Sequence, residues 1–120
     1  MKLLKSLGLA ALAGLLVVPA PAAAPPPVTV KVVPNVGMAP ATVRVTVKVE
    51  PDGRNRGLMV EADSQDFYSS SEITLDGNES SRTQRFEFKN LPPGRYEIRA
   101  TVERNDGNRQ MANAEYLVSG

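Results

Sequence analysis

Residues 90–102 have the sequence Asn-Leu-Pro-Pro-Gly-Arg-Tyr-Glu-Ile-Arg-Ala-Thr-Val, a turn followed by an alternating segment. Asn, Pro and Gly favour turns, each through its own backbone preference. After the turn, apolar residues occupy every second position, which is the period of a strand with one face on a core. The segment therefore predicts a turn that leads into a β-strand, with an inward set of Tyr96, Ile98, Ala100 and Val102.

The same alternation recurs through residues 28–118, and it is clearest where four valines alternate with polar residues in 43–49. Turn-forming residues separate these segments at 34–40, 51–55, 63–66, 76–78 and 105–108. The alternation weakens after residue 66, and a strand is predicted there only at 72–75. About seven short strands at nearly regular spacing predict an all-β, antiparallel sandwich.

Two segments resemble known families. Residues 90–102, with the Asn-Asp-Gly turn at 105–107, resemble the E–F corner and F strand of fibronectin type III and PKD-like domains. Residues 34–43, Pro-Asn-Val-Gly-Met-Ala-Pro-Ala-Thr-Val, resemble the opening of PKD repeats. The resemblance implies an immunoglobulin-like β-sandwich over residues 28–120. It also implies a structural corner of Leu91, Gly94 and Tyr96, in which the Tyr96 ring is buried and its hydroxyl binds nearby backbone.

Residues 1–22 have the three parts of a signal peptide. Lys2 and Lys5 lie in a short basic segment, residues 7–18 are uncharged and apolar, and Ala20-Pro21-Ala22 offers a cleavage site. The apolar run is shorter than the roughly 20 residues that span a bilayer. Residues 23–27, Ala-Ala-Pro-Pro-Pro, form a stiff spacer. We therefore expect a secreted or periplasmic protein without stable membrane insertion after cleavage.

Composition narrows the chemistry that we expect. The sequence contains neither His nor Cys, and its 14 Lys and Arg nearly balance 13 Asp and Glu. Without His or Cys, the commonest general base and the thiol nucleophile are missing, and residues 69–71, three serines, have no His partner. We therefore expect no catalytic residues, no cofactor and no enzymatic activity. A nucleic-acid partner would require basic residues clustered on one face, and the sequence indicates no such cluster, so we expect no nucleic-acid partner.

Acidic residues in the predicted turns leave a calcium site open as an alternative. Calcium binds several oxygen ligands that converge from loops, although these residues do not have the spacing of an EF-hand. Carboxylates in such turns more often bind their own backbone. No metal ligand is predicted, but a ligand-binding module for carbohydrate or calcium at a loop pole is the alternative function. The residues concerned are Asp52, Asp63, Asp66, Asp76 and Asp106.

Phe67 and Tyr68 are the candidate contact residues for a partner. Adjacent residues of a strand face opposite sides, so at least one of the two rings should be exposed. The pair interrupts the alternation beside Asp66 and three serines, a mixture suited to polar contact around an aromatic anchor. The favoured function is an exported, non-enzymatic module for protein–protein interaction, or an accessory domain. Its expected partner is another exported or envelope protein.

Overall fold

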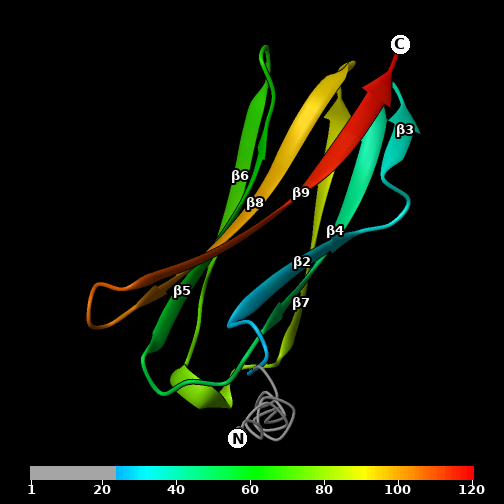
Figure 1. Ribbon diagram of the computed structural model, residues 1–120. Coiled ribbons are helices and arrows are strands. Elements are labelled where there is room, and N and C mark those ends of the chain that lie inside the picture. Colours follow the sequence, from blue (N-terminus) through cyan, green and yellow to red (C-terminus); the bar gives the residue numbers. More distant parts are fainter. Residues whose placement is uncertain (1–23) are drawn as a thin grey trace, which may run out of the picture.

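The computed structural model describes residues 24–120, so the predicted signal peptide lies outside the described residues. The described chain consists of strands and one short 3-10 helix (Figure 1). No helix within it is long and apolar enough to cross a membrane. In chain order the elements are β2 (Val28–Val32), β3 (Val36–Met38), β4 (Ala41–Val49), β5 (Asn55–Asp63), β6 (Tyr68–Thr74), η1 (Gly77–Glu79), β7 (Thr83–Leu91), β8 (Gly94–Arg104) and β9 (Arg109–Ser119).

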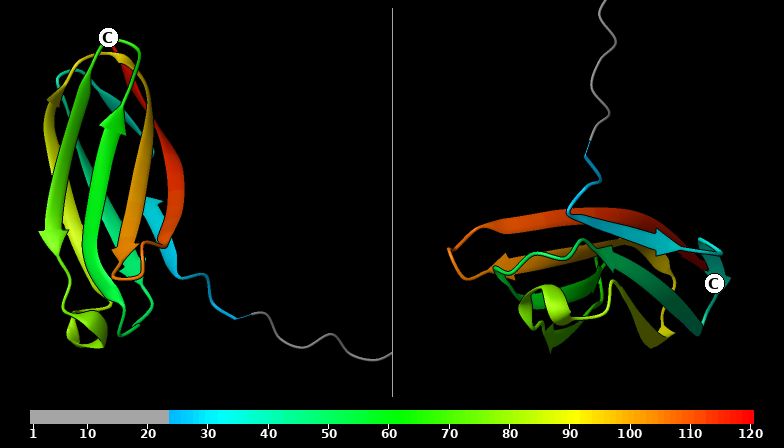
Figure 2. Two further views of the ribbon diagram at one scale, coloured as in Figure 1. Left: turned by 90° about the vertical axis from the view of Figure 1, so that its left-hand side faces the viewer. Right: turned by 90° about the horizontal axis from the view of Figure 1, so that it is seen from below.

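These strands form two sheets that pack face to face. One sheet has the order β2-β4-β7 and the other has the order β3-β9-β8-β5-β6. Figure 2 shows η1 at one end of the sandwich and the C-terminus at the other. Among the described strands, all neighbouring pairs are antiparallel except β3 and β9. The all-β, two-sheet prediction is confirmed, with eight strands in residues 24–120 where about seven were expected.

The core lies between the sheets and follows the predicted alternation. In β4, Val43, Val45 and Val47 are fully buried, while the residues between them face outward. β-branched side chains fit this pleated surface well, and each buried valine contributes roughly 1.5–3 kcal/mol relative to an exposed one. From the opposite sheet, Leu58 and Ile98 complete the centre of the core.

Strand β6 differs from its prediction. A strand was expected only at 72–75, but β6 begins at Tyr68 and pairs with β5 along its whole length. Its inward positions include Ser69 and Ser71, which are only half-buried because β6 is an edge strand. Edge positions do not require large apolar side chains, so the alternation of hydrophobicity disappears from this sequence although the strand remains.

Strand β3 is a second difference, because residues 34–40 were expected to break the chain. Three of these residues instead form a short strand parallel to β9. The chain thereby leaves the three-stranded sheet after β2 and joins the five-stranded sheet. A strand of three residues is too short for its side-chain alternation to stand out between Pro34 and Pro40.

The turn before β8 brings three sequence-predicted residues together. Tyr96 is fully buried, and its hydroxyl donates a hydrogen bond to the Pro92 carbonyl at 2.7 Å. Leu91 is also fully buried, at the end of β7. Gly94 begins β8 beside the Tyr96 ring. We expect this arrangement to stabilise the domain, as the resemblance implies.

Candidate functional site

The outer face of the five-stranded sheet carries a connected cluster of polar and charged side chains. Its members come from four neighbouring strands, β6, β5, β8 and β9. Two rows across the sheet supply them: Glu61 lies opposite Arg99, and Asp63 lies between Tyr68 and Glu97. We call this group the Arg99 cluster: Glu61, Asp63, Tyr68, Glu97, Arg99 and Asn113.

Arg99 is the centre of this cluster. Its Nε donates to Glu61 at 3.0 Å, and its Nη1 donates to Glu97 at 2.9 Å. The carboxylate of Asp63 lies 3.5 Å from Nη2. Arginine suits this position because its planar guanidinium offers several donors in fixed directions. One cation thus holds three carboxylates together on an open sheet face, and the cluster keeps a net negative charge.

Tyr68 occupies the border of the cluster at the edge of the sheet. Its side chain is 53% exposed, and its hydroxyl donates a hydrogen bond to Glu61. That bond, followed by the bond from Arg99, lowers the pKa of Glu61. The same bond raises the pKa of the Tyr68 hydroxyl. The hydroxyl is thereby tied to the sheet face while about half of the residue stays exposed, as an aromatic contact residue requires.

Phe67 lies on the other side of the chain. Its half-buried ring packs edge-on against Tyr96, with the ring centroids 6.3 Å apart. The backbone N–H of Phe67 donates to the Ser64 hydroxyl at 3.1 Å, which fixes the turn between β5 and β6. Of the two candidate contact residues, Tyr68 is therefore the exposed one. Phe67 supports the turn that presents it.

Glu61 and Arg99 are site residues that the sequence analysis did not single out. They are 38 positions apart in the chain, and only the pairing of β5 with β8 places them opposite each other. The alternation shows that both face outward, but it does not give the register between strands. Tyr68 was found because it is one of two adjacent aromatic residues, a signal that needs no register.

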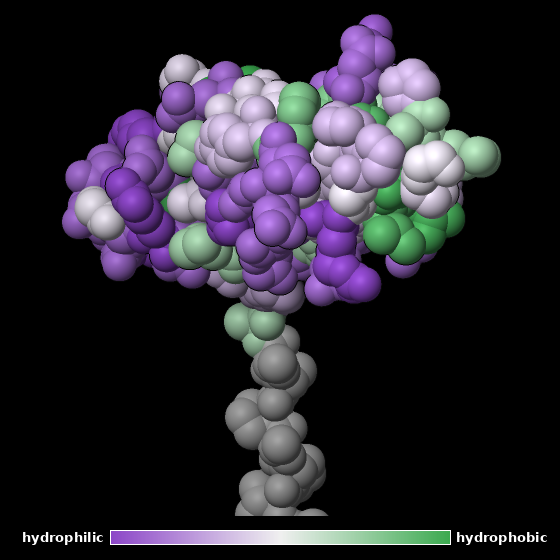
Figure 3. Space-filling model, turned by 90° about the horizontal axis from the view of Figure 1, so that it is seen from above, coloured by the Kyte–Doolittle hydropathy of each residue, from purple (hydrophilic) through white to green (hydrophobic). Residues whose placement is uncertain are grey.

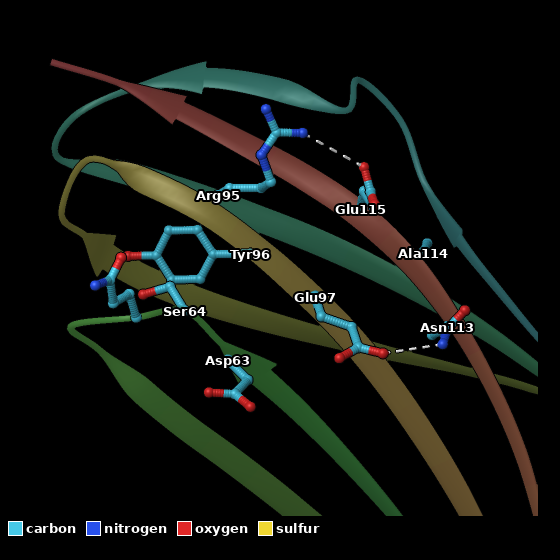
Figure 4. A pocket seen from close by; sticks show the side chains of 9 residues that line it. Asp63, Ser64, Arg95, Tyr96, Glu97, Asn113, Ala114 and Glu115 are labelled. Atoms are coloured by element: carbon cyan, nitrogen blue, oxygen red, sulfur yellow. Dashed lines mark hydrogen bonds and ion pairs between the residues drawn. The ribbon is translucent and has the colours of Figure 1, made fainter.

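A shallow pocket of about 410 Å³ lies next to the cluster, at the end of the sheet beyond Asp63 (Figure 4). Most of its lining is polar. Asn113 donates to Glu97 at 2.9 Å, and Arg95 lies 3.9 Å from Glu115. The pocket offers charged and amide groups to a polar side chain or ligand rather than an apolar cavity.

The turns near the start of β5 carry a second group of charged residues, separate from the Arg99 cluster. Arg54 lies between two of the acidic turn residues, at 2.9 Å from Asp52 and 3.1 Å from Asp106. Its hydrogen bonds hold the pKa of Asp52 well below its usual range. The pKa of Asp106 is lowered chiefly by the backbone N–H of Asn108. These two carboxylates are thus engaged within the protein.

The five acidic residues considered for calcium do not come together. Asp63 is the last residue of β5 and Asp66 follows it, whereas Asp52 precedes the start of β5. Asp76 precedes η1, and its backbone N–H donates a hydrogen bond to the Ser80 hydroxyl oxygen. In residues 24–120, no group of three or more His, Cys, Asp or Glu side chains is placed to hold a metal ion.

Comparison with known proteins finds similarity in structure only. No family model and no curated protein matches the sequence. Superoxide reductase (neelaredoxin) from Ignicoccus hospitalis is similar in structure, with a TM-score of 0.60, 16% identity, and coverage of 76% of this chain and 80% of that one. Fibronectin(III)-like modules of Clostridium thermocellum CbhA match with a TM-score of 0.51, 17% identity, and coverage of 75% and 94%.

A CARDB domain from Pyrococcus furiosus, solved in complex with di-metal ions, also matches. Its TM-score is 0.51 at 20% identity, and the match covers 77% of this chain and 90% of that domain. At such identities these likenesses show the fold alone. The fold is an immunoglobulin-like β-sandwich, similar to fibronectin(III)-like and CARDB modules, as the resemblance implied.

One expectation is corrected by the comparison. The absence of His and Cys led us to expect that the domain is not an enzyme, but superoxide reductase, an enzyme, has a similar fold. The inference was too broad, because missing His and Cys exclude only the mechanisms that need those side chains. Carboxylates, tyrosines and arginines remain available to chemistry in this chain.

Proposed function

We propose that this chain is an exported β-sandwich module that binds another exported or envelope protein through strand β6 and Tyr68. The observation that carries the proposal is the position of β6. It is a seven-residue strand at the border of the five-stranded sheet, hydrogen-bonded on one side to β5. Tyr68, at its start, is the exposed aromatic member of the Arg99 cluster.

The second edge of β6 is open to an added strand. Within the described residues β6 pairs only with β5, so its other row of backbone N–H and C=O groups has no strand partner. β6 contains no proline and a single charged residue, Glu72, so it lacks the usual features that discourage edge pairing. An extended segment of a partner can use such an edge by strand addition, with side-chain contacts giving specificity.

The charge of the neighbouring face indicates the partner's chemistry. Tyr68 and Glu72 face the same side as Glu61 and Asp63, because β6 and β5 pair in register. In the described part of the chain, Glu72 has no ion pair. A partner strand with Lys or Arg at alternate positions would complement this side. Tyrosine is among the residue types that most often dominate binding energy at interfaces.

Capture of the native partner and measurement of its affinity test this proposal. With a partner identified from the host envelope or culture fluid, Tyr68→Ala should weaken binding by roughly 2 kcal/mol, because the ring is the exposed anchor. Met111→Ala is the matched control: Met111 is exposed on the same sheet face, but on β9, which β8 and β5 separate from β6. Circular dichroism and melting should show both variants folded. Equal affinities of the two variants would contradict the role of Tyr68.

A further inference from the structure

The outer face of the three-stranded sheet has a composition unlike that of the rest of the molecule. The outward positions of β2, β4 and β7 carry five cations and one carboxylate, and the others are mainly threonines. All six charged side chains belong to exposed residues. We call this surface the basic face, defined by Lys31, Arg44, Lys48, Arg85, Glu87 and Lys89.

The register spreads these cations over the whole face. Thr46 lies between Lys31 and Arg85 in one row across the three strands, and Lys48 lies in the next row. The one carboxylate, Glu87, binds Arg44 at 3.0 Å and Lys89 at 3.6 Å. Lys31, Lys48 and Arg85 have no ion pair within residues 24–120. Three cations on neighbouring strands are therefore free to meet external anions.

An exposed apolar group adjoins the basic face at the β3 edge. We call it the apolar edge: Val33, Val36 and Met38, which are 69%, 55% and 73% exposed. Figure 3, viewed from above, shows apolar side chains gathered on the side where Figure 1 places β3. Large apolar side chains grouped on a surface mark sites of interaction more often than scattered ones do.

The packing of β3 explains why these side chains point outward. Gly37, between Val36 and Met38, faces inward, and a Cβ at this position would overlap the Tyr116 hydroxyl. The side chains on either side of Gly37 therefore face away from the core. A groove of about 250 Å³ beside the strand is lined by all three apolar-edge residues and by Arg44. The apolar edge thus continues directly into the basic face.

We propose that the basic face and the apolar edge together dock the domain on an anionic lipid bilayer. The free cations complement lipid phosphates, and each cation near an anionic surface strengthens binding. The apolar edge can enter the boundary between headgroups and acyl chains, as apolar side chains of peripheral proteins do. This second feature favours a membrane over a nucleic acid, whose phosphate backbone offers no apolar layer to Val36 and Met38.

The proposed membrane surface and the proposed protein contact lie on different parts of the molecule. The basic face belongs to the three-stranded sheet, and β6 borders the other sheet at the edge opposite β3 (Figure 1). The domain can therefore lie on a bilayer while β6 remains open to a partner. Variants of one surface leave the other unchanged, so each proposal can fail alone.

Vesicle binding tests the membrane proposal. The protein is used as its host exports it, with its N-terminus established by intact mass. It is mixed with phosphatidylcholine vesicles and with vesicles in which phosphatidylglycerol replaces part of that lipid. We expect cosedimentation with the second kind only, and a loss at raised salt. The double variant K48E/R85E should lower the partition coefficient at least tenfold, and V36S/M38S should lower it severalfold.

The matched control reverses the same number of charges on the opposite face. Arg95 and Arg109 are exposed on the outer face of the five-stranded sheet, so R95E/R109E changes net charge equally and should retain most of the binding. Equal binding to both kinds of vesicle, no binding to either, or an equal loss in the control would each overturn the proposal. An acidic protein as the true occupant would give the second outcome. If K48E/R85E fails to fold, K31Q/K48Q replaces it.

Discussion

The outer faces of the two sheets carry opposite charge, although the chain as a whole is nearly neutral. The basic face has five cations and one carboxylate. The outward positions of β5, β6, β8 and β9 carry six carboxylates and four arginines. Net charge and the linear order of residues hide this separation, because a sheet face takes every second residue from strands far apart in sequence.

The two faces also differ in how their charges are paired. On the five-stranded sheet Arg95, Arg99 and Arg109 each have a carboxylate partner, and Arg99 has three. On the basic face three cations have no such partner within residues 24–120. Charges that are paired in a fixed geometry beside a hydrogen-bonded tyrosine favour binding of a partner with a complementary shape. Free cations on a flat face favour attraction to an extended anionic surface, which needs no exact fit.

Removing one arginine from each face should give the largest difference in the free energy of unfolding. Arg99→Ala leaves three carboxylates without their shared cation, and Arg99 and Glu61 are mostly buried. We expect a loss of about 2 kcal/mol in the free energy of unfolding, less than for a deeply buried pair because the cluster is partly solvated. Arg85→Ala removes an exposed cation without an ion pair, so it should change stability by no more than about 0.5 kcal/mol.

Urea unfolding at neutral pH measures both variants. The Arg99→Ala midpoint should fall clearly below that of Arg85→Ala, with unchanged slopes. If the two midpoints coincide, the ion pairs of the Arg99 cluster contribute no net stability. The two faces then differ only in the sign of their net charge. Raised salt should narrow the difference, since screening weakens the repulsion among the remaining carboxylates.

Removing a tyrosine hydroxyl should change the free energy of unfolding less than removing Arg99 does. Tyr96 is buried under the sheet, and its hydroxyl donates to the Pro92 carbonyl. Tyr96→Phe leaves that carbonyl without its partner, which should cost on the order of 1 kcal/mol or more. An unchanged urea midpoint would show that the corner analogy with fibronectin type III domains is wrong, although the sandwich itself would stand.

The sequence predicted the buried half of this molecule better than the exposed half. Alternation identified the inward sets of β4 and β8, including Tyr96, because burial imposes an apolar residue at every second position. It missed β3 and the first half of β6, which are edge segments where that requirement is weak. Core positions are constrained locally, whereas edge strands depend on pairing with distant residues.

The candidate sites show the same limit. Tyr68 could be selected from the sequence, but its partners Glu61 and Arg99 depend on the register of three strands. The basic face was also missed, since its cations are separated by up to 58 positions, from Lys31 to Lys89. The prediction that nucleic acid is not a partner rested on balanced charge and on the absence of basic residues clustered on one face, and the basic face shows that such a cluster exists. The absence of a nucleic-acid partner stays a prediction.

Removing the hydrogen bond between Tyr68 and Glu61 should give the smallest measurable change in stability. It is the largest cause of the lowered pKa of Glu61, ahead of Arg99. A carboxyl whose pKa is lower in the folded protein than in the unfolded chain stabilises the folded state at pH values above its pKa in the unfolded chain. That contribution disappears as the pH falls through the folded pKa. The Tyr68 hydroxyl should therefore stabilise the domain at neutral pH and not in strong acid.

Tyr68→Phe removes the hydroxyl and keeps the ring. The pKa of Glu61 should rise toward its ordinary value while Arg99 still holds it below, which NMR titration of the side-chain carboxyl carbon can follow. The pKa of Asp106 is the internal control, because its lowering comes from Asn108 and Arg54 at the far end of β5. Urea midpoints of the variant and the wild type should differ at neutral pH and converge below the folded pKa of Glu61. An unmoved Glu61 would show that Arg99 alone sets its charge and that Tyr68 is not held over the acidic face.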